Sequence, residues 1–430
     1  MKRVLIAILS GMALESWAQG IEDKPVVQDV EKAVLSEDFW SKGPEEERDF
    51  LRANRFRWTS PQKEALRSAA SNLVFMGFPV AEAIIWMKAG TPQEVQLSLY
   101  NRGDCKAVGE SGFLAMIQAA QKAITQRTQT VPTSSEPATL KGFPSKRQVW
   151  KSGGVAFVME WDASIKKQEG SDFLAEFLRV RLLPQNGLTL SSQGQQVSTM
   201  ALSRKTVTKT DQGDIYLADI PMVDQGPKGY CAVATTERVL RYYGAKVDQH
   251  QLAKIAETAE GTDPISLMKG LQRMSIELRV NIDVLEEISF AAFQKMVKGY
   301  NTSAKRAHRQ EIILPTSGVI SVNGVYSEMD PELLKDSKVR NKAGLDKFND
   351  RIVQYINNRM PLVWGVMLGL FPEEKLAQAK GGHLRLIIGY NAKTKEVIYS
   401  DSWGSGHEFK RMPIEQAYTI TTSLFSLRPK

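Results

Sequence analysis

The chain has 430 residues, of which 42% are hydrophobic and 24% are charged, as in folded globular proteins, so a chain without a packed core is excluded. The length is typical of two or three domains. A formal net charge of +8 is small for this size, and there is no run of five basic residues, so we expect no nucleic-acid partner. Two cysteines are too few for a disulfide framework or a four-cysteine zinc site.

The first residues have the three parts of a secretory signal peptide. Lys2 and Arg3 precede an apolar run over 4–14, and Ser16-Trp17-Ala18 provides small residues for cleavage after Ala18. This run is too short to span a bilayer, as is every later apolar stretch. We therefore expect residues 1–18 to be a signal peptide, a periplasmic or extracellular location, and no integral membrane segment in the mature chain.

Residues 20–130 are predicted to form an α+β module of unknown role. Residues 29–51 have the mixed, acidic composition of a helical region, and the alternation over 95–99 predicts a half-buried strand. Apolar residues spaced three and four apart over 113–124 predict an amphipathic helix. The Pro-, Thr- and Ser-rich segment 131–147 is predicted to be a linker.

A strand-rich module is predicted over 148–213. Apolar and aromatic residues recur over 148–161 and over 173–183, as in paired strands. The polar stretch 193–213 predicts a loop that leads into a domain over 215–430.

The sequence around Cys231 has the pattern of an activated thiol. The glycine- and proline-rich turn 226–229 precedes Cys231, and apolar residues at helical spacing follow it as far as Tyr243. Cys231 is therefore expected at a helix N-terminus, where the peptide dipoles stabilise a thiolate. Gln225 stands six residues earlier, where its amide could donate to an oxyanion beside the sulfur.

A base for this thiol is predicted late in the chain. His383 opens an apolar strand pattern over 384–390, and a second strand over 396–400 leads into Asp401. If the two strands pair in antiparallel fashion, Asp401 returns beside His383 and its carboxylate holds the imidazole tautomer. Trp403 would then cover this hydrogen bond from water.

These residues resemble the motifs of papain-like cysteine peptidases. Gln225, Cys231, His383 and the run Asp401-Ser402-Trp403-Gly404 match the family pattern in order and spacing. The aspartate and the short Gly-Tyr-Cys-Ala and Gly-His-Leu forms are most similar to the C39-type branch, which processes bacteriocin leaders at double-glycine sites.

The resemblance covers about 219–430, within the domain predicted over 215–430. It implies a papain-like α+β fold, a helix packed on an antiparallel sheet, that acts on a peptide or protein substrate without a cofactor. The implied catalytic residues are Cys231, His383 and Asp401, with Gln225 in the oxyanion hole and Gly229, Tyr230 and Trp403 supporting the site.

Several features depart from the family pattern or extend it. The stretch 261–346 is longer than a minimal domain needs, and a hairpin is expected in it around 318–325. A helix over 345–358 and a strand over 361–369 are expected to complete the core. Residues 20–218 match nothing in the family and no transporter region is present, so the resemblance does not imply double-glycine specificity.

Other interpretations stay open at the level of sequence. Cys231 is also compatible with a buried structural thiol. The same scaffold suits acyl transfer to an amine, such as transpeptidation, or a peptide-binding protein without activity.

The remaining histidines and motifs give weaker hypotheses. His407 is a rival base, whereas His250 and His308 are expected to be solvated. Cys105 is expected to lie in a turn and not to pair with Cys231, and Asn301-Thr302-Ser303 has the spacing of a glycosylation site.

Overall fold

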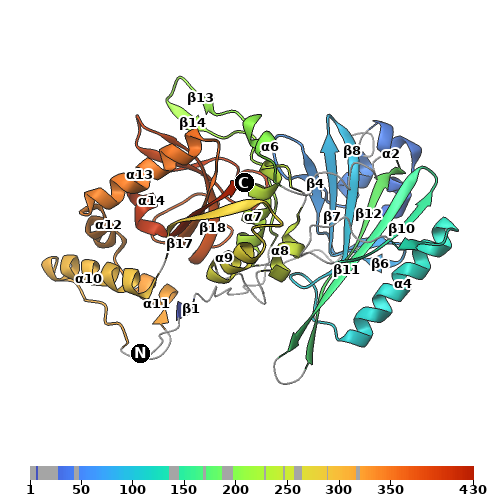
Figure 1. Cartoon of the computed structure of the whole chain (residues 1–430), viewed down its shortest axis with the longest axis horizontal. Helices are drawn as coiled ribbons and strands as arrows, with labels where there is room; N and C mark the ends of the chain where they lie inside the picture. The colour runs from blue at the N-terminus through green and yellow to red at the C-terminus, as the bar shows by residue number, and fades with distance from the viewer. Residues whose placement is uncertain are drawn as a thin grey trace. The chain divides into compact units, whose positions relative to one another are not determined.

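The structure of the chain is a computed structural model (Figure 1). It describes residues 6–7, 28–42, 48–134, 145–167, 171–185, 197–226, 229–245, 247–255, 264–287, 289–315 and 320–430. Helices and mainly antiparallel sheets confirm the predicted α+β class. The chain divides into an N-terminal unit, residues 15–196 with 246–254, and a C-terminal unit, residues 1–14 with 197–245 and 255–430.

The N-terminal unit is built on one antiparallel sheet with the strand order β3-β4-β7-β8-β12-β11-β10-β9. Its strands are β3 (Arg57–Trp58), β4 (Ala65–Ser68), β7 (Glu82–Lys88), β8 (Thr91–Asn101), β9 (Thr133–Ser134), β10 (Lys146–Ser152), β11 (Val155–Lys167) and β12 (Ser171–Pro184). A smaller sheet joins β2 (Gln28–Asp29), β5 (Leu73–Phe75) and β6 (Phe78–Pro79).

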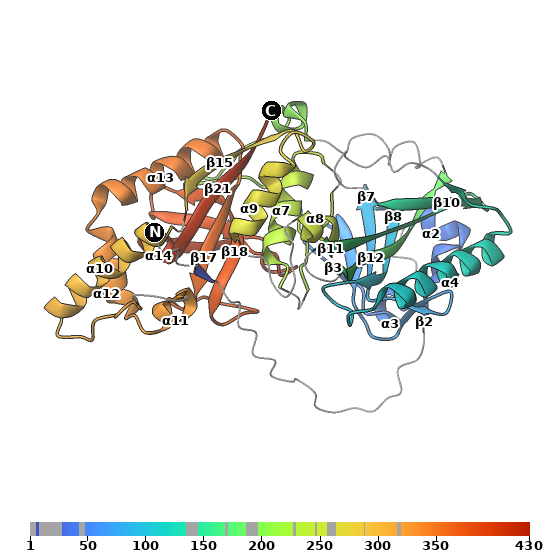
Figure 2. The ribbon, with the colours of Figure 1, turned by 60° about the horizontal axis from the view of Figure 1, so that its bottom comes forward.

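Helices cover one face of the large sheet (Figure 2). They are α1 (Val30–Val34), α2 (Glu37–Lys42), α3 (Arg48–Ala53) and α4 (Glu110–Thr128). The predicted helical spacing is confirmed in α4, which buries Phe113, Ile117 and Ile124 in the same core as Leu97 and Phe157. Side chains of this size each contribute about 1.5–3 kcal/mol when they are removed from water.

The two N-terminal modules expected on either side of 131–147 share this sheet. Strand β12, from the second expected module, pairs with β8 from the first, so both sets of strands belong to one unit. The expected linker also begins inside regular structure, because β9 pairs with β10. Local composition predicts the polar connection, but only the long-range pairing shows which strands it joins. Residues 135–144 of the expected linker lie outside the described residues.

A cluster of charged side chains is buried in the same sheet, and we call it the sheet cluster: Glu94, Arg147, Glu160, Arg179 and Arg181. Arg147, Glu160 and Arg179 face one another across β10, β11 and β12 in register. Arg179 Nη2 lies 2.8 Å from Glu160 Oε2, and Arg181 donates two hydrogen bonds to Glu94. Burial raises the pKa of Glu160, but the three guanidinium groups outweigh this and lower it to about 2.

The C-terminal unit contains a second antiparallel sheet with the order β13-β14-β18-β17-β21-β15, and β19 and β20 extend it from β18. Its strands are β13 (Thr208–Lys209), β14 (Asp214–Tyr216), β15 (Val280–Glu286), β17 (Leu362–Leu368), β18 (Gly381–Asn391), β19 (Glu396–Ser400), β20 (Lys410–Pro413) and β21 (Thr421–Pro429). All residues of β17 are buried, as expected for a central strand.

Helices lie on both faces of this sheet, with α7 and α9 on one face and α13 on the other (Figure 2). The helices of the unit are α6 (Thr199–Ser203), α7 (Cys231–Tyr242), α9 (Pro264–Arg273), α10 (Phe290–Arg306), α11 (Val322–Ser327), α12 (Pro331–Val339), α13 (Lys342–Asn357) and α14 (Ile414–Ile420). The predicted helix 345–358 and strand 361–369 are confirmed by α13 and β17.

The hairpin expected around 318–325 is wrong. The short strand β16 (Ile320–Ser321) leads directly into helix α11, whose first turn is capped because Ser321 Oγ accepts a hydrogen bond from Gly324 N. This local cap favours a helical turn over a hairpin. The polar stretch 193–213 also contains a short helix, α6.

Most of residues 1–18, the predicted signal peptide, lies outside the described residues. The structure describes Ile6–Ala7 there as the strand β1, which pairs in parallel with β16. One described helix remains to be assigned, α8 (Gln249–Ile255). Most of it belongs to the N-terminal unit.

Candidate active site

Cys231 is the first residue of α7, as the sequence predicts. Tyr230, in a non-helical conformation and buried, is the N-cap residue, and Gly229 precedes it in a bend. The thiol is therefore placed where the unpaired N–H groups of the first helical turn are concentrated. Residues 227 and 228 of the predicted turn lie outside the described residues.

Helix α7 is held in place by buried polar side chains one and two turns beyond Cys231. Thr235 Oγ1 donates to the carbonyl of Leu384 at 3.2 Å. Arg238 donates to the carbonyl of Asp401 at 2.9 Å and to Ser400 Oγ at 2.6 Å. These bonds fix the helix that carries the thiol against the strands that carry the predicted base.

A β-bulge sets which residues of β18 face the end of β19. Tyr390 pairs with Val397, but beyond the bulge at Ile388 the register changes by one residue, so that Leu386 pairs with Ser400. Continued by one residue, this register places Asp401 opposite Arg385, on the face of β18 that also carries His383. Without the bulge, Asp401 would face the side of Leu386.

The predicted contact between His383 and Asp401 is present in the structure. His383 Nε2 lies 3.1 Å from Asp401 Oδ1, within hydrogen-bond distance, and both side chains are completely buried. The Trp403 ring stacks on the imidazole, with ring centroids 4.4 Å apart and an angle of 14° between the planes. Trp403 thus covers the imidazole as the sequence analysis expects.

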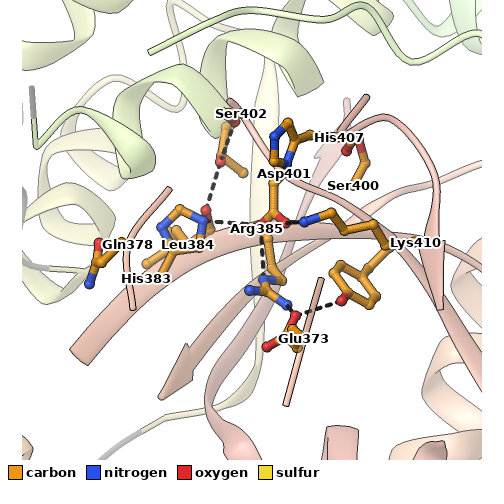
Figure 3. Close-up of polar contacts among 12 residues, drawn as sticks. Glu373, Gln378, His383, Leu384, Arg385, Ser400, Asp401, Ser402, His407 and Lys410 are labelled. Carbon is orange, nitrogen blue, oxygen red and sulfur yellow. Dashed lines mark hydrogen bonds and ion pairs between the residues drawn. The ribbon is translucent and has the colours of Figure 1, made fainter. Parts of the chain in front are cut away.

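Asp401 also contacts two cations, and Figure 3 shows it with His383, Arg385 and Lys410 on three sides. Arg385 Nε lies 3.0 Å from Oδ1, and Lys410 Nζ lies 3.2 Å from Oδ2. Behind Arg385, Glu373 Oε2 accepts a hydrogen bond from Arg385 Nη1 at 2.7 Å. We call His383, Arg385, Asp401, Lys410 and Glu373 the Asp401 cluster.

The electrostatics of the site favour a charged Cys231–His383 pair. Burial raises the pKa of the Cys231 thiol, but a hydrogen bond to His383 and the charge of the imidazolium outweigh it, so the pKa is lowered. Burial lowers the pKa of His383, but hydrogen bonds to Asp401 and Cys231 raise it above its ordinary value. Because Nε2 faces Asp401, Nδ1 is the nitrogen left to interact with the sulfur.

Asp401 stays ionised in this buried position. Burial raises the pKa of its carboxyl, but Arg385, His383 and Lys410 together hold the pKa far below its ordinary value. A thiolate, an imidazolium and a carboxylate in this order supply a nucleophile, a proton donor and a group that orients the donor.

Gln225 is buried next to the same segment. Its backbone N–H donates to the carbonyl of Ser402 at 2.8 Å, which ties the residues before Cys231 to the residues after Asp401. His407, the rival base, packs edge-on against Trp403, and its carbonyl accepts a hydrogen bond from Asp401 N.

Three other sequence expectations have clear outcomes. The expectation that His250 is solvated is wrong, because it is buried with Nε2 3.5 Å from Glu82 Oε2. His308 is exposed, as expected. Asn301, in the glycosylation-type spacing, is half-buried, and its amide donates to the carbonyl of Ile312 and accepts from Ile312 N.

Sequence analysis missed Arg238, Arg385 and Lys410. Arg238 has a detectable signal, because it lies two helical turns after Cys231 and so shares its face. The sequence signal for Arg385 is weaker: it follows His383 by two residues in a strand and so shares its face. Lys410 gives no signal before the pairing of β19 with β20 is known.

Within the described ranges, no group of three or more His, Cys, Asp or Glu side chains is arranged to hold a metal ion. None of the helices described in the structure combines the length and the apolar composition that a membrane span requires. Cys105 and Cys231 are not joined in a disulfide, as expected.

Comparison with known proteins agrees with the site geometry. The model of the Peptidase C39 like family matches residues 217–424, a segment that contains Gln225, Cys231, His383 and Asp401. Residues 217–424 form a C39-type cysteine peptidase domain. The match does not extend to the N-terminal unit.

Among solved structures, the chain is similar to xylellain, a cysteine protease from Xylella fastidiosa. The two are 11% identical with a TM-score of 0.27, over 55% of this chain and 90% of the other. No curated protein matches the chain.

Proposed function

We propose that the C39-type domain hydrolyses peptide bonds with Cys231 as nucleophile, His383 as general acid and base, and Asp401 as the group that orients His383. The observation that carries this proposal is the arrangement of a half-buried Cys231 with the buried pair His383 and Asp401, in which the pKa of the thiol is lowered and that of the imidazole is raised. Opposite shifts in two neighbouring groups are typical of catalytic pairs.

The proposed reaction has two steps. The Cys231 thiolate attacks the peptide carbonyl carbon, and His383 gives its proton to the leaving amine, so that a thioester and a free amine result. His383 then takes a proton from water, and the hydroxide attacks the thioester and releases the carboxylic acid and the thiolate. Asp401 keeps Nδ1 of His383 directed at the sulfur throughout.

The side-chain amide of Gln225 and the backbone N–H of Cys231 are proposed to stabilise the oxyanion of each tetrahedral intermediate. The burial of Gln225 and its backbone bond to Ser402 support this role, because both hold it beside the residue that follows Asp401. One such donor contributes about 3–4 kcal/mol in comparable sites. Gly229 and Tyr230 are proposed to shape the turn that presents the thiol.

The protein is proposed to be exported through residues 1–18 as a signal peptide. The basic pair Lys2-Arg3, the short apolar run and the small residues around Ala18 support this proposal. N-terminal sequencing of the secreted or periplasmic protein is expected to give a chain that begins at Gln19.

A thiol-directed peptidase probe tests the catalytic proposal. The full chain is incubated with a peptidyl electrophile, and the labelled residue is located by mass spectrometry, beside Cys231→Ala and, as a matched control, Cys105→Ala. We expect the wild type and Cys105→Ala to be labelled and Cys231→Ala to lose labelling. Equal labelling of wild type and Cys231→Ala would show that Cys231 is not the nucleophile.

Cleavage of a peptide mixture then defines the reaction class. Hydrolysis gives two products with free carboxylate and amine ends, and an added amine leaves them unchanged. Products that incorporate the added amine would instead identify the domain as an acyltransferase.

A further inference from the structure

Both oxygens of Asp401 are held by cations other than His383. Oδ1 is shared by His383 Nε2 at 3.1 Å and Arg385 Nε at 3.0 Å, while Oδ2 lies 3.2 Å from Lys410 Nζ. A single imidazolium would balance the charge of this carboxylate. The domain buries two further cations around it, although charge removed from water without need is costly.

The surroundings of these cations explain how they are kept there. Glu373 accepts hydrogen bonds from Arg385 at 2.7 Å and from Tyr399 OH at 2.6 Å, so the guanidinium is held between two carboxylates. The Lys410 ammonium also donates to the carbonyls of Glu374 and Lys375 at 3.3 and 3.4 Å. Both cations are therefore fixed beside Asp401 by contacts that do not involve His383.

Other titratable groups around Asp401 come from α7 and from the segment between β19 and β20. Arg238 of α7 donates to its backbone carbonyl rather than to its carboxylate. His407 and Glu408 lie in the segment between β19 and β20 and interact electrostatically with Asp401 and with Arg238, respectively. The carboxylate oxygens themselves are left to His383, Arg385 and Lys410.

This arrangement has two physical consequences. The carboxylate cannot rotate about its Cβ–Cγ bond without losing both ion pairs, so Oδ1 stays directed at His383 Nε2. In addition, the two cations offset part of the negative charge that His383 experiences, so the imidazolium is held less strongly than by an isolated carboxylate. A group that must both release and regain a proton needs a pKa that is neither too high nor too low, so its proton must be held with intermediate strength.

We propose that Arg385 and Lys410 are positioning residues of the C39-type site, which fix the Asp401 carboxylate toward His383 and moderate its hold on the imidazolium proton. This inference rests on the proposed function, in which His383 is the acid and base. It assigns a role in the reaction to two residues that touch neither the substrate nor the sulfur.

The test uses full-length variants in a Cys105→Ser background, so that Cys231 is the only thiol. The variants are Lys410→Met, Lys410→Arg and Arg385→Met, with Lys393→Met as the control, because the Lys393 ammonium donates to the carbonyl of Asp211 instead. Lys410, with Glu373 and Tyr399, lines a cavity of about 470 Å³, which leaves room for the arginine. The rate of alkylation by iodoacetamide is measured against pH, beside kcat/KM for a cleaved peptide.

Loss of a cation lets Asp401 hold the imidazolium more strongly, so the pKa of His383 rises and its deprotonation moves to higher pH. In Lys410→Met and Arg385→Met we expect this alkaline transition to rise by about half a pH unit or more, and kcat/KM to fall about tenfold. Lys410→Arg is expected to restore both quantities, and Lys393→Met to change neither.

An alkaline transition that stays in place, or moves to lower pH, in folded Lys410→Met would overturn the inference, even if thermal stability falls. If Arg385→Met does not fold, Lys410→Met decides alone, since its side chain is 12% exposed. Failure of the proposed function looks different, because wild-type Cys231 would then react with iodoacetamide like an ordinary thiol, without a transition from His383.

Discussion

The sheet cluster of the N-terminal unit and the Asp401 cluster of the C-terminal unit are both buried and ion-paired, but they differ in what their members can do. In the sheet cluster, the pKa of Glu160 is lowered to about 2, so its ion pairs keep their charges at neutral pH. The Asp401 cluster ends in His383 and Cys231, whose pKa values are shifted in opposite directions. Buried charge alone is therefore typical of a structural role, whereas a buried group that can exchange a proton indicates a catalytic role.

The largest effect is expected from removal of the base. His383→Ala should lower kcat/KM for peptide hydrolysis by a factor of about 10⁴ to 10⁶, because it removes both the proton donor and the partner of the thiolate. Circular dichroism should show an intact fold, and His250→Ala in the N-terminal unit is the matched control. Activity retained in His383→Ala would break the distinction between the two clusters.

The pH dependence of the wild type sharpens the same distinction. The lowered pKa of Cys231 keeps the thiolate at lower pH, so activity is lost only when the pH falls through that pKa. The raised pKa of His383 moves the loss of its proton, and of activity, to higher pH. We expect a bell-shaped profile of kcat/KM whose acid limb follows Cys231 and whose alkaline limb follows His383. A single transition near the pKa of an ordinary thiol would contradict the ion pair.

Asp401→Asn tests the orienting group and should lower kcat by a factor of up to about 10⁴. The amide lacks the negative charge that stabilises the imidazolium, so the pKa of His383 falls and the alkaline limb of the profile moves to lower pH. This is the opposite of the direction expected for Lys410→Met. Profiles recorded for both variants under the same conditions check the sign, and movement in the same direction would show that charge is not the cause.

Glu160→Gln tests the sheet cluster, where stability rather than chemistry should change. The variant leaves three guanidinium groups without their shared carboxylate and should lower the free energy of unfolding by about 3–5 kcal/mol. Because the folded-state pKa is depressed, this contribution is present above the ordinary carboxyl pKa and is lost as the pH falls toward about 2. Urea unfolding at several pH values measures it, and kcat/KM of the folded variant should equal that of the wild type.

The smallest effect is expected from a substitution of Trp403, the ring that covers the His383 imidazole. Trp403→Phe keeps an aromatic ring near His383 but reduces the stacked area, so kcat/KM should fall about three- to tenfold, in line with about 0.5–1.5 kcal/mol for an aromatic contact. Phe409→Leu, at a partly exposed ring of the same domain, is the control. A loss as large as that of Asp401→Asn would mean that Trp403 does more than cover the imidazole.

The sequence by itself predicts the parts of the site that depend on local patterns. The turn and the apolar spacing after Cys231 place the thiol at the start of a helix, and alternation places His383 in a strand. It also predicts that two strands return Asp401 toward His383, because a short connection favours an antiparallel pair. These features are encoded within a few residues of one another.

Only the tertiary structure decides which face of the sheet Asp401 reaches. The bulge at Ile388 shifts the register by one residue, and the carbonyl of Ile388 accepts a hydrogen bond there from Leu217 N, the residue after β14. The next residue, Gly389, has no room for a Cβ beside Tyr216. Residues about 170 positions apart therefore fix the register, and no local period carries that information.

Long-range strand pairing, which no local pattern predicts, also brings the charges together around the site and assembles the N-terminal sheet. Arg385 and Lys410 meet Asp401 only after three strands have paired, and β8 meets β12 only after the long segment between them has folded back. A charged residue in a strand pattern looks solvated until its partner across the sheet is known. Local spacing thus determined the thiol and its base, and long-range pairing determined the charges that surround them.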